Sequence, residues 1–139
     1  MINDILSKQN INTAMENLLQ KKDSAGVDGM YLSELPEYLK NNREALIANI
    51  LSGNYKPGLV QVMDILNSKG KVRTISKLIS LDRLILRAIY QVLYARISPR
   101  ISPFSFALRE NKSTVDAVRQ AAKYAEEGFT YTIELYTAG

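Results

Sequence analysis

Apolar side chains recur every three or four residues along several stretches of the chain, which is the spacing of one face of an α-helix. The clearest stretch begins at Ser80 and runs up to Pro99, with Leu81, Leu84 and Ala88 on its apolar side. The same spacing predicts four further helices, over residues 13–21, 34–40, 42–51 and 113–127, and a short apolar turn over residues 2–7.

Capping residues set the expected ends of these helices. Thr13 and Glu16 have the spacing of a capping box, in which two side chains bind free backbone N–H groups at the helix start. Asn41 and Glu44 repeat that spacing, so we expect a break between the helices over 34–40 and 42–51. Gly53 follows the second of these, where glycine commonly ends a helix. Ser33 and Ser80 are the expected N-caps of the helices that follow them. The helix over 113–127 is expected to end at Gly128, and its expected buried side consists of Ala117, Val118, Ala121, Ala122 and Ala125.

Two β-prone runs, residues 59–66 and 71–78, flank a turn that contains asparagine and glycine. This arrangement indicates a β-hairpin. Residues 129–135 are interpreted as one further strand. The pattern therefore predicts an α+β fold that is mostly helical, with a β-hairpin and a short further strand. A length of 139 residues suits a single domain, residues 1–139.

The chain contains no cysteine and no histidine. Disulfides, thiolate metal sites and imidazole catalysis are therefore excluded for this sequence. No apolar run approaches the roughly 20 residues of a membrane span, and no secretory signal is recognisable at the N-terminus. We expect no membrane partner and a cytoplasmic location.

Positive charge is concentrated in the middle of the chain. Residues 56–112 carry 11 lysines and arginines against 3 acidic residues, a net charge of +8, whereas residues 1–55 and 113–139 each carry −2. Lys69, Lys71 and Arg73 are two residues apart, so they share one face of the predicted hairpin. Such a segment is typical of a face that binds a polyanion such as RNA. The alternative is a basic surface that is simply solvated.

Five short motifs resemble, in order, the reverse transcriptase region of group II intron proteins. Residues 23–29 contain Ala-Gly-Val-Asp-Gly, and residues 51–57 are similar to an "hxGxYxP" element. Residues 70–73 resemble the turn before "RPLGIP", residues 82–83 the "DR" of the next helix, and residues 106–113 the "YGFRPGRS" motif. Each motif is weak alone, but their order and spacing together make a strong resemblance, which extends from about Asn12 to Leu135.

The chain departs from the family pattern at several positions. Residues 65–67, Ile-Leu-Asn, stand where the family has "IPK", so its lysine is missing, and residues 73–78 lack the proline and glycine of "RPLGIP". Residues 108–113 keep Arg109 and Ser113 of "FRPGRS". Tyr136 occupies the position of the first metal-binding aspartate.

The resemblance implies the fingers subdomain of a right-hand polymerase fold, with the palm truncated. Residues 1–30 would be an N-terminal extension and entry loop, and residues 31–135 the fingers portion. The parent protein would copy RNA into DNA with Mg²⁺ and a DNA primer, and would bind intron RNA to assist splicing. This chain has six scattered aspartates and no Asp-Asp pair. We therefore expect it to bind RNA without catalytic or metal-binding residues of its own.

The resemblance also assigns candidate contacts. Arg73 matches the arginine of "RP", which in the family meets the nucleotide triphosphate, and Lys69 or Lys71 would stand in for the missing lysine. Arg109 matches an arginine near the template. The other candidates for RNA or template binding are Lys112, Lys77, Arg83, Arg87, Lys21 and Lys22.

Structural alternatives exist for several of these residues. Lys21 and Lys22 suit the C-terminal end of a helix, and Arg83 or Arg87 could pair with Asp82. Three tyrosines could stack on bases or be half-buried packing residues: Tyr55, Tyr90 and Tyr94.

Three other functions remain open at this point. The parent could be another bacterial reverse transcriptase, of the retron, diversity-generating or CRISPR-associated kind. The chain could be a non-enzymatic RNA-binding splicing module, which the altered "RPLGIP" and Tyr136 favour. It could also be a helical domain that binds other proteins.

Overall fold

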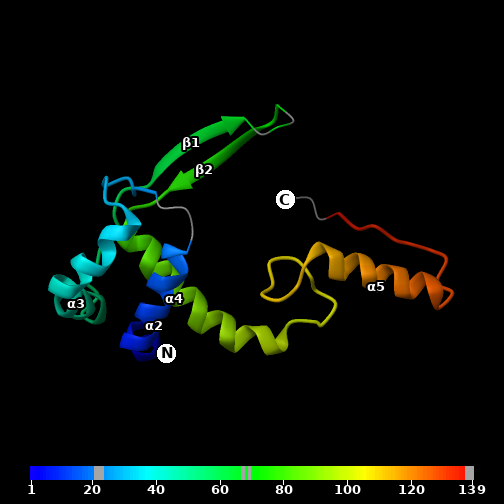
Figure 1. Ribbon diagram of the computed structural model, residues 1–139, viewed down its shortest axis with the longest axis horizontal. Helices are drawn as coiled ribbons and strands as arrows, with labels where there is room; N and C mark the ends of the chain where they lie inside the picture. Colours follow the sequence, from blue (N-terminus) through cyan, green and yellow to red (C-terminus); the bar gives the residue numbers. More distant parts are fainter. Residues whose placement is uncertain (21–23, 67, 69, 137–139) are drawn as a thin grey trace. The chain divides into compact units, whose positions relative to one another are not determined.

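The computed structural model describes residues 1–20, 24–66, 68 and 70–136, and it divides into two compact units (Figure 1). The first unit comprises residues 1–97 and the second begins at Ser98. The fold is α+β, with a two-stranded antiparallel hairpin among the helices, as predicted. The expected fingers fold and the expected boundaries at residues 30 and 135 stay predictions.

The N-terminal helix begins earlier than its capping pattern suggested. Helix α1 spans Ile2–Leu6 and α2 spans Lys8–Leu19. Ser7 separates them and caps α2, since its hydroxyl accepts a hydrogen bond from the backbone N–H of Asn10 at 3.2 Å. The predicted start at Thr13 is wrong because the buried stripe already begins at Ile11, one turn before Ala14 and Leu18.

The two helices expected over 34–40 and 42–51 form one helix. A 3₁₀ turn at Leu32–Glu34 leads into α3, Leu35–Leu51. Asn41 and Asn42 do not break it, because their amides donate to the carbonyls of Glu37 and Tyr38, one turn earlier. Ser33 is not the cap; the Glu34 carboxylate accepts from the backbone N–H of Tyr31 at 2.6 Å.

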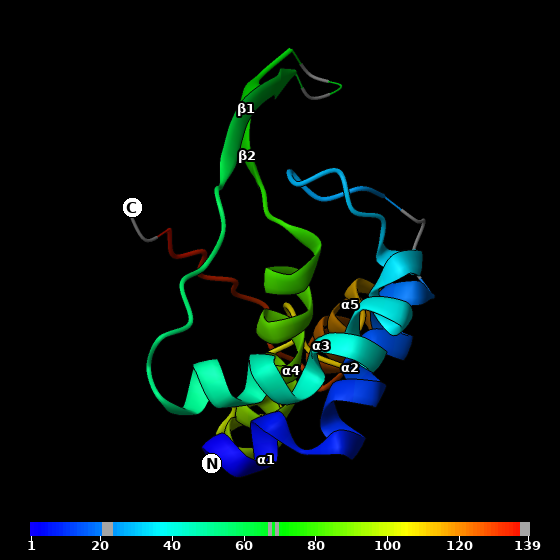
Figure 2. The same ribbon diagram turned by 90° about the vertical axis from the view of Figure 1, so that its left-hand side faces the viewer.

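The end of α3 and the hairpin agree with the sequence. Gly53 follows the last turn of α3 with φ of +73°, the left-handed conformation expected of it. Strands β1, Gln61–Leu66, and β2, Val72–Lys77, pair antiparallel from Gln61 opposite Lys77 to Leu66 opposite Val72. Figure 2 shows the hairpin extending beyond the helices of the first unit.

Helix α4, Ser80–Ile97, supplies the centre of the first unit's core. Leu84 and Ala88 are fully buried, as the apolar stripe predicted. They belong to one cluster with residues of the preceding helices, namely Ile5, Leu6, Ile11, Ala14, Leu18, Leu32, Leu35, Leu39 and Leu46. Ser80 begins α4, but its buried hydroxyl donates to the Met30 carbonyl at 2.7 Å, so it fixes a loop to the helix.

The second unit contains a 3₁₀ turn at Ser98–Arg100 and helix α5, Thr114–Glu126. Ser113 and Asp116 form a capping box at the start of α5, and hydrogen bonds from Ser113 lower the pKa of the Asp116 carboxyl. Gly128, with φ of +96°, ends the helix as predicted.

Two expectations for this unit are wrong. Residues 129–135 do not form a strand, and Tyr131 is 94% exposed. On the expected buried side of α5, Ala117 is half-buried and the other four residues are exposed, with Val118 at 63%. Both misses have one cause: within the described part of the second unit, no strand pairs with residues 129–135 and no helix or strand packs on α5. Among the described helices, none has the length and apolar character needed to cross a membrane.

Candidate nucleic-acid interface

The loop that contains the Ala-Gly-Val-Asp-Gly motif packs on the junction between β2 and α4. The backbone N–H of Val27 donates to the Leu78 carbonyl at 3.2 Å, and that of Gly26 donates to the Met30 carbonyl at 2.7 Å. Gly26 has no room for a side chain, since a Cβ would lie 2.5 Å from the backbone nitrogen of Ser80. The loop is therefore fixed to the base of the hairpin.

A buried carboxylate joins a second motif to the same helix. Asp82, 6% exposed, accepts hydrogen bonds from the Tyr55 hydroxyl at 2.5 Å and from the backbone N–H of Gly58 at 2.8 Å. Burial and this hydrogen bond raise the pKa of Tyr55 above its ordinary value of 10.0. The sequence does not reveal these contacts, because the two partners of Asp82 lie 27 and 24 residues away along the chain.

A hollow of about 390 Å³ lies at the base of the hairpin, beside the motif loop. Lys77 and Arg83, two predicted RNA contacts, both line it. The Arg83 guanidinium donates to the carbonyl and hydroxyl oxygens of Ser24 at 3.2 and 3.1 Å. We call this site the hairpin-base hollow; its full lining is Ser24, Ala25, Met63, Ile75, Ser76, Lys77, Leu78 and Arg83.

The hairpin carries a further cation on the same face. Alternation along β2 puts Arg73 on the face of Ile75 and Lys77. Arg73 is exposed and lies opposite Ile65 on β1. Lys71 is exposed just before β2. Three further lysine candidates lie outside the described residues: Lys69, Lys21 and Lys22.

Arg87 is engaged within α4. Its guanidinium carbon lies 5.1 Å from the ring centroid of Tyr90, a cation–π contact, and Tyr90 stacks on Tyr94 at 5.4 Å. The proposed ion pair with Asp82 is not formed by Arg83 or Arg87, because that carboxylate is bound by Tyr55 and Gly58. The three tyrosines considered for base stacking thus have intramolecular partners.

The two candidates of the second unit hold its own loop. The Arg109 guanidinium donates to the carbonyls of Ser102 at 3.1 Å and Ile101 at 3.4 Å. Lys112 donates from Nζ to the Pro103 carbonyl at 3.2 Å and lies 4.8 Å above the Phe106 ring. Arg109 therefore holds the loop that precedes α5 through its backbone carbonyls. The ammonium group of Lys112 already contacts the Pro103 carbonyl and the Phe106 ring.

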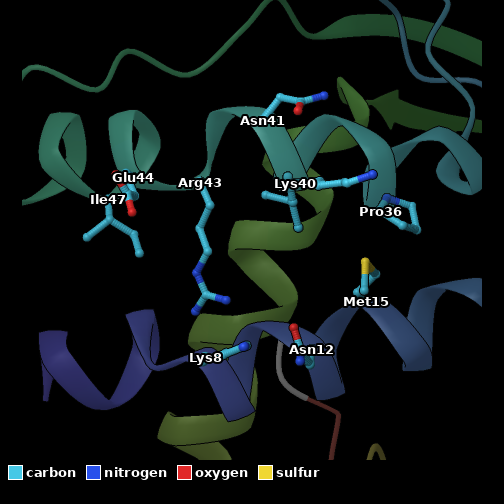
Figure 3. Close-up of a pocket in the computed structure, with 10 residues that line it drawn as sticks. Lys8, Asn12, Met15, Pro36, Lys40, Asn41, Arg43, Glu44 and Ile47 are labelled. Carbon is cyan, nitrogen blue, oxygen red and sulfur yellow. The ribbon is translucent and has the colours of Figure 1, made fainter.

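A second basic hollow, of about 690 Å³, separates α2 from α3 (Figure 3). Arg43 extends from α3 toward α2, where Lys8 lies, while Lys40 and Glu44 come from the α3 side. The sequence did not reveal this site because residues 1–55 carry a net charge of −2. The spacing of Lys8 and Arg43 along the chain gives no signal either, since they meet because α2 and α3 line the same hollow.

Within the described residues, no group of three or more acidic side chains is placed to hold a metal ion. No protein-family model matches the chain, and no curated protein matches it.

Proposed function

We propose that the chain is the N-terminal part of a group II intron reverse transcriptase/maturase, and that its hairpin and hairpin-base hollow bind RNA phosphates. The observation that carries this proposal is the meeting of three motifs at one place. The loop over 24–29 is bonded to Leu78, the element over 51–57 is bonded to Asp82, and Arg83 reaches back to Ser24. Motifs that resemble one family in order are thus also neighbours in space.

The chemistry of the site suits an RNA backbone. Guanidinium and ammonium groups bind phosphate through charge and directed hydrogen bonds. Helical RNA is recognised mainly through its backbone and 2′-hydroxyl groups. Arg73, Lys77 and Arg83 offer three cations along the hairpin and its base. In the whole protein, Arg73 would meet the nucleotide triphosphate, and Mg²⁺ and the DNA primer would bind at a palm.

A second candidate is a non-enzymatic RNA-binding splicing module. Tyr136 at the expected aspartate position favours it. RNA binding by the hairpin is common to both candidates, and also to another bacterial reverse transcriptase. The reverse transcriptase activity of the whole protein separates the candidates, whereas RNA binding by this chain tests what they share.

Replacing Arg73 and Lys77 together by glutamine is expected to reduce the salt dependence of RNA binding. Each phosphate contact contributes about 0.7 to 0.9 to the slope of log affinity against log salt. The double variant should therefore lose about 1.5 units of slope and bind about tenfold more weakly at low salt. Fluorescence anisotropy with a labelled structured RNA over a salt series measures both quantities.

The matched control is the double variant Arg96→Gln/Arg100→Gln, which removes the same charge from exposed positions outside the hairpin and outside both hollows. We expect it to keep most of the wild-type slope. Equal losses in the two double variants would contradict a site on the hairpin and leave only general attraction to a basic protein.

A further inference from the structure

The second unit contains a hollow of about 450 Å³ between the irregular loop that precedes α5 and α5 itself. Two aromatic rings, Phe104 and Phe106, lie on the loop side. Helix α5 contributes two cations, Arg119 and Lys123. The complete lining is Pro103, Phe104, Phe106, Asn111, Lys112, Asp116, Arg119, Gln120 and Lys123.

The loop is held in one conformation by its own cations. The Arg109 guanidinium binds the carbonyls of Ile101 and Ser102, and Lys112 binds the Pro103 carbonyl. Leu108 and Asn111 adopt φ of 54° and 60°, in the left-handed region that side chains other than glycine rarely occupy. Such backbone persists only where surrounding contacts hold it, and it is concentrated at ligand sites. The rings are therefore presented on a preorganised loop.

The two rings differ in what they offer. Lys112 lies over the Phe106 ring, so the cation already occupies a face of that ring. Phe104 is 59% exposed and touches Tyr124 at a tilted 6.3 Å between centroids. Phe104 is thus the ring with surface available for a flat ligand.

The charges around the hollow favour an anion. Lys112, Arg119 and Lys123 line it together with one carboxylate, Asp116. That carboxylate accepts hydrogen bonds from Ser113 and lies 3.4 Å from Arg119, and Lys123 lies 3.8 Å from Glu127. Both ion pairs are solvent-exposed and therefore weak, so each cation can exchange its carboxylate for a phosphate. The two amides of the lining, on Asn111 and Gln120, add donors and acceptors of the kind that bind base edges.

We propose that this hollow binds one unpaired nucleotide of a single-stranded RNA, with the base against Phe104 and a neighbouring phosphate at Arg119 and Lys123. Aromatic rings beside cations form the usual surface for single-stranded nucleic acid, because every base has a face that stacks. An acidic peptide would satisfy the cations but would leave Phe104 without a flat partner. The proposal rests on the proposed RNA-binding function. It adds a second RNA-binding site to the one proposed on the hairpin.

The test compares two probes that differ only in their bases: a labelled RNA of six adenylates, and a six-residue abasic backbone of the same charge. The complete chain should bind the adenylate probe about tenfold more tightly, since stacking of one base contributes a factor of this order. Phe104→Leu keeps the apolar bulk and removes the aromatic face. It should abolish the preference and leave binding of the abasic probe unchanged.

Two further variants test whether the preference for bases depends on the Phe104 ring and whether the phosphate binds at Arg119. Tyr131→Leu removes an exposed ring outside the hollow and should keep the preference. Arg119→Gln should weaken both probes alike. A wild-type chain that binds both probes equally, or a preference that survives Phe104→Leu, would overturn the proposal while leaving RNA binding by the hairpin intact. No salt-dependent binding of either probe, or of a structured RNA, would instead mean that the proposed function has failed and this site with it.

Discussion

Replacing Asp82 by alanine is expected to lower the free energy of unfolding by about 3 kcal/mol. The carboxylate is buried and accepts from both the Tyr55 hydroxyl and the Gly58 N–H. Its removal leaves two half-buried donors without their acceptor. Urea titration followed by circular dichroism measures the loss as a shift of the midpoint at constant slope.

Asp64 provides a control for this substitution. It is exposed on β1 and accepts a hydrogen bond from the Thr74 hydroxyl at 2.6 Å. Asp64→Ala should cost less than about 1 kcal/mol, as surface hydrogen bonds do. Equal effects of the two substitutions would show that the Asp82 interactions do not hold the 51–58 segment to α4.

The same contact predicts a loss of stability at alkaline pH. The folded state raises the pKa of Tyr55 by burial and by the hydrogen bond to Asp82, so it favours the neutral hydroxyl. A raised pKa contributes stability that is complete below the ordinary value of 10.0 and is lost as the pH rises above it. In the urea titration, the advantage of the wild type over Tyr55→Phe should therefore shrink above pH 10.

Replacing Gly26 by alanine is the second large effect that we expect, about 2 to 3 kcal/mol in the free energy of unfolding. A Cβ at this position would lie 2.3 Å from the Asp28 carboxylate, 2.5 Å from the Ser80 nitrogen and 3.0 Å from the Ile79 carbonyl carbon. The Ser80 nitrogen begins α4 and the Ile79 carbon directly precedes it, so neither backbone atom can rotate away. The motif loop would have to move off the helix, and the unfolding midpoint should fall accordingly.

Gly29 in the same loop provides a control for the Gly26 substitution, because an alanine there changes the backbone preference without a steric clash. It has φ of +79°, and no atom would lie within 4 Å of a Cβ built on it. Gly29→Ala should therefore cost only about 1 kcal/mol, the penalty of left-handed backbone. A smaller effect at Gly26 than at Gly29 would contradict the packing of this loop on α4.

Elements with strong local signals were predictable from the sequence. The Asn-Ser-Lys-Gly sequence between two β-prone runs predicted the hairpin, and the apolar stripe around Leu84 predicted α4. Weaker signals competed with tertiary packing. Asn41 and Glu44 have capping spacing, yet Leu39 and Leu46 are both buried in one core, so a continuous helix is preferred. Residues 129–135 have strand composition, but a strand also needs a partner, which composition does not supply.

The sequence indicated which cationic side chains are candidates for the site, but it did not indicate which groups those side chains contact. Lys77 and Arg83 both belong to the basic middle segment, but the sequence did not predict that they line one hollow. Arg109 has the residue type of a template contact, but its guanidinium is taken up by the carbonyls of its own loop. These hydrogen bonds depend on where the backbone turns, as at Leu108. Short sequence motifs do not predict that backbone geometry.

The most direct test of the account compares binding of this chain to a group II intron RNA and to an unrelated structured RNA of equal length. Both titrations are run at several salt concentrations, with Arg73→Gln/Lys77→Gln alongside. We predict tighter binding to the intron RNA, a preference that survives moderate salt, and weaker binding in the variant. Equal and weak binding to both RNAs, unchanged in the variant, would contradict the maturase assignment and leave a basic surface without a specific RNA partner.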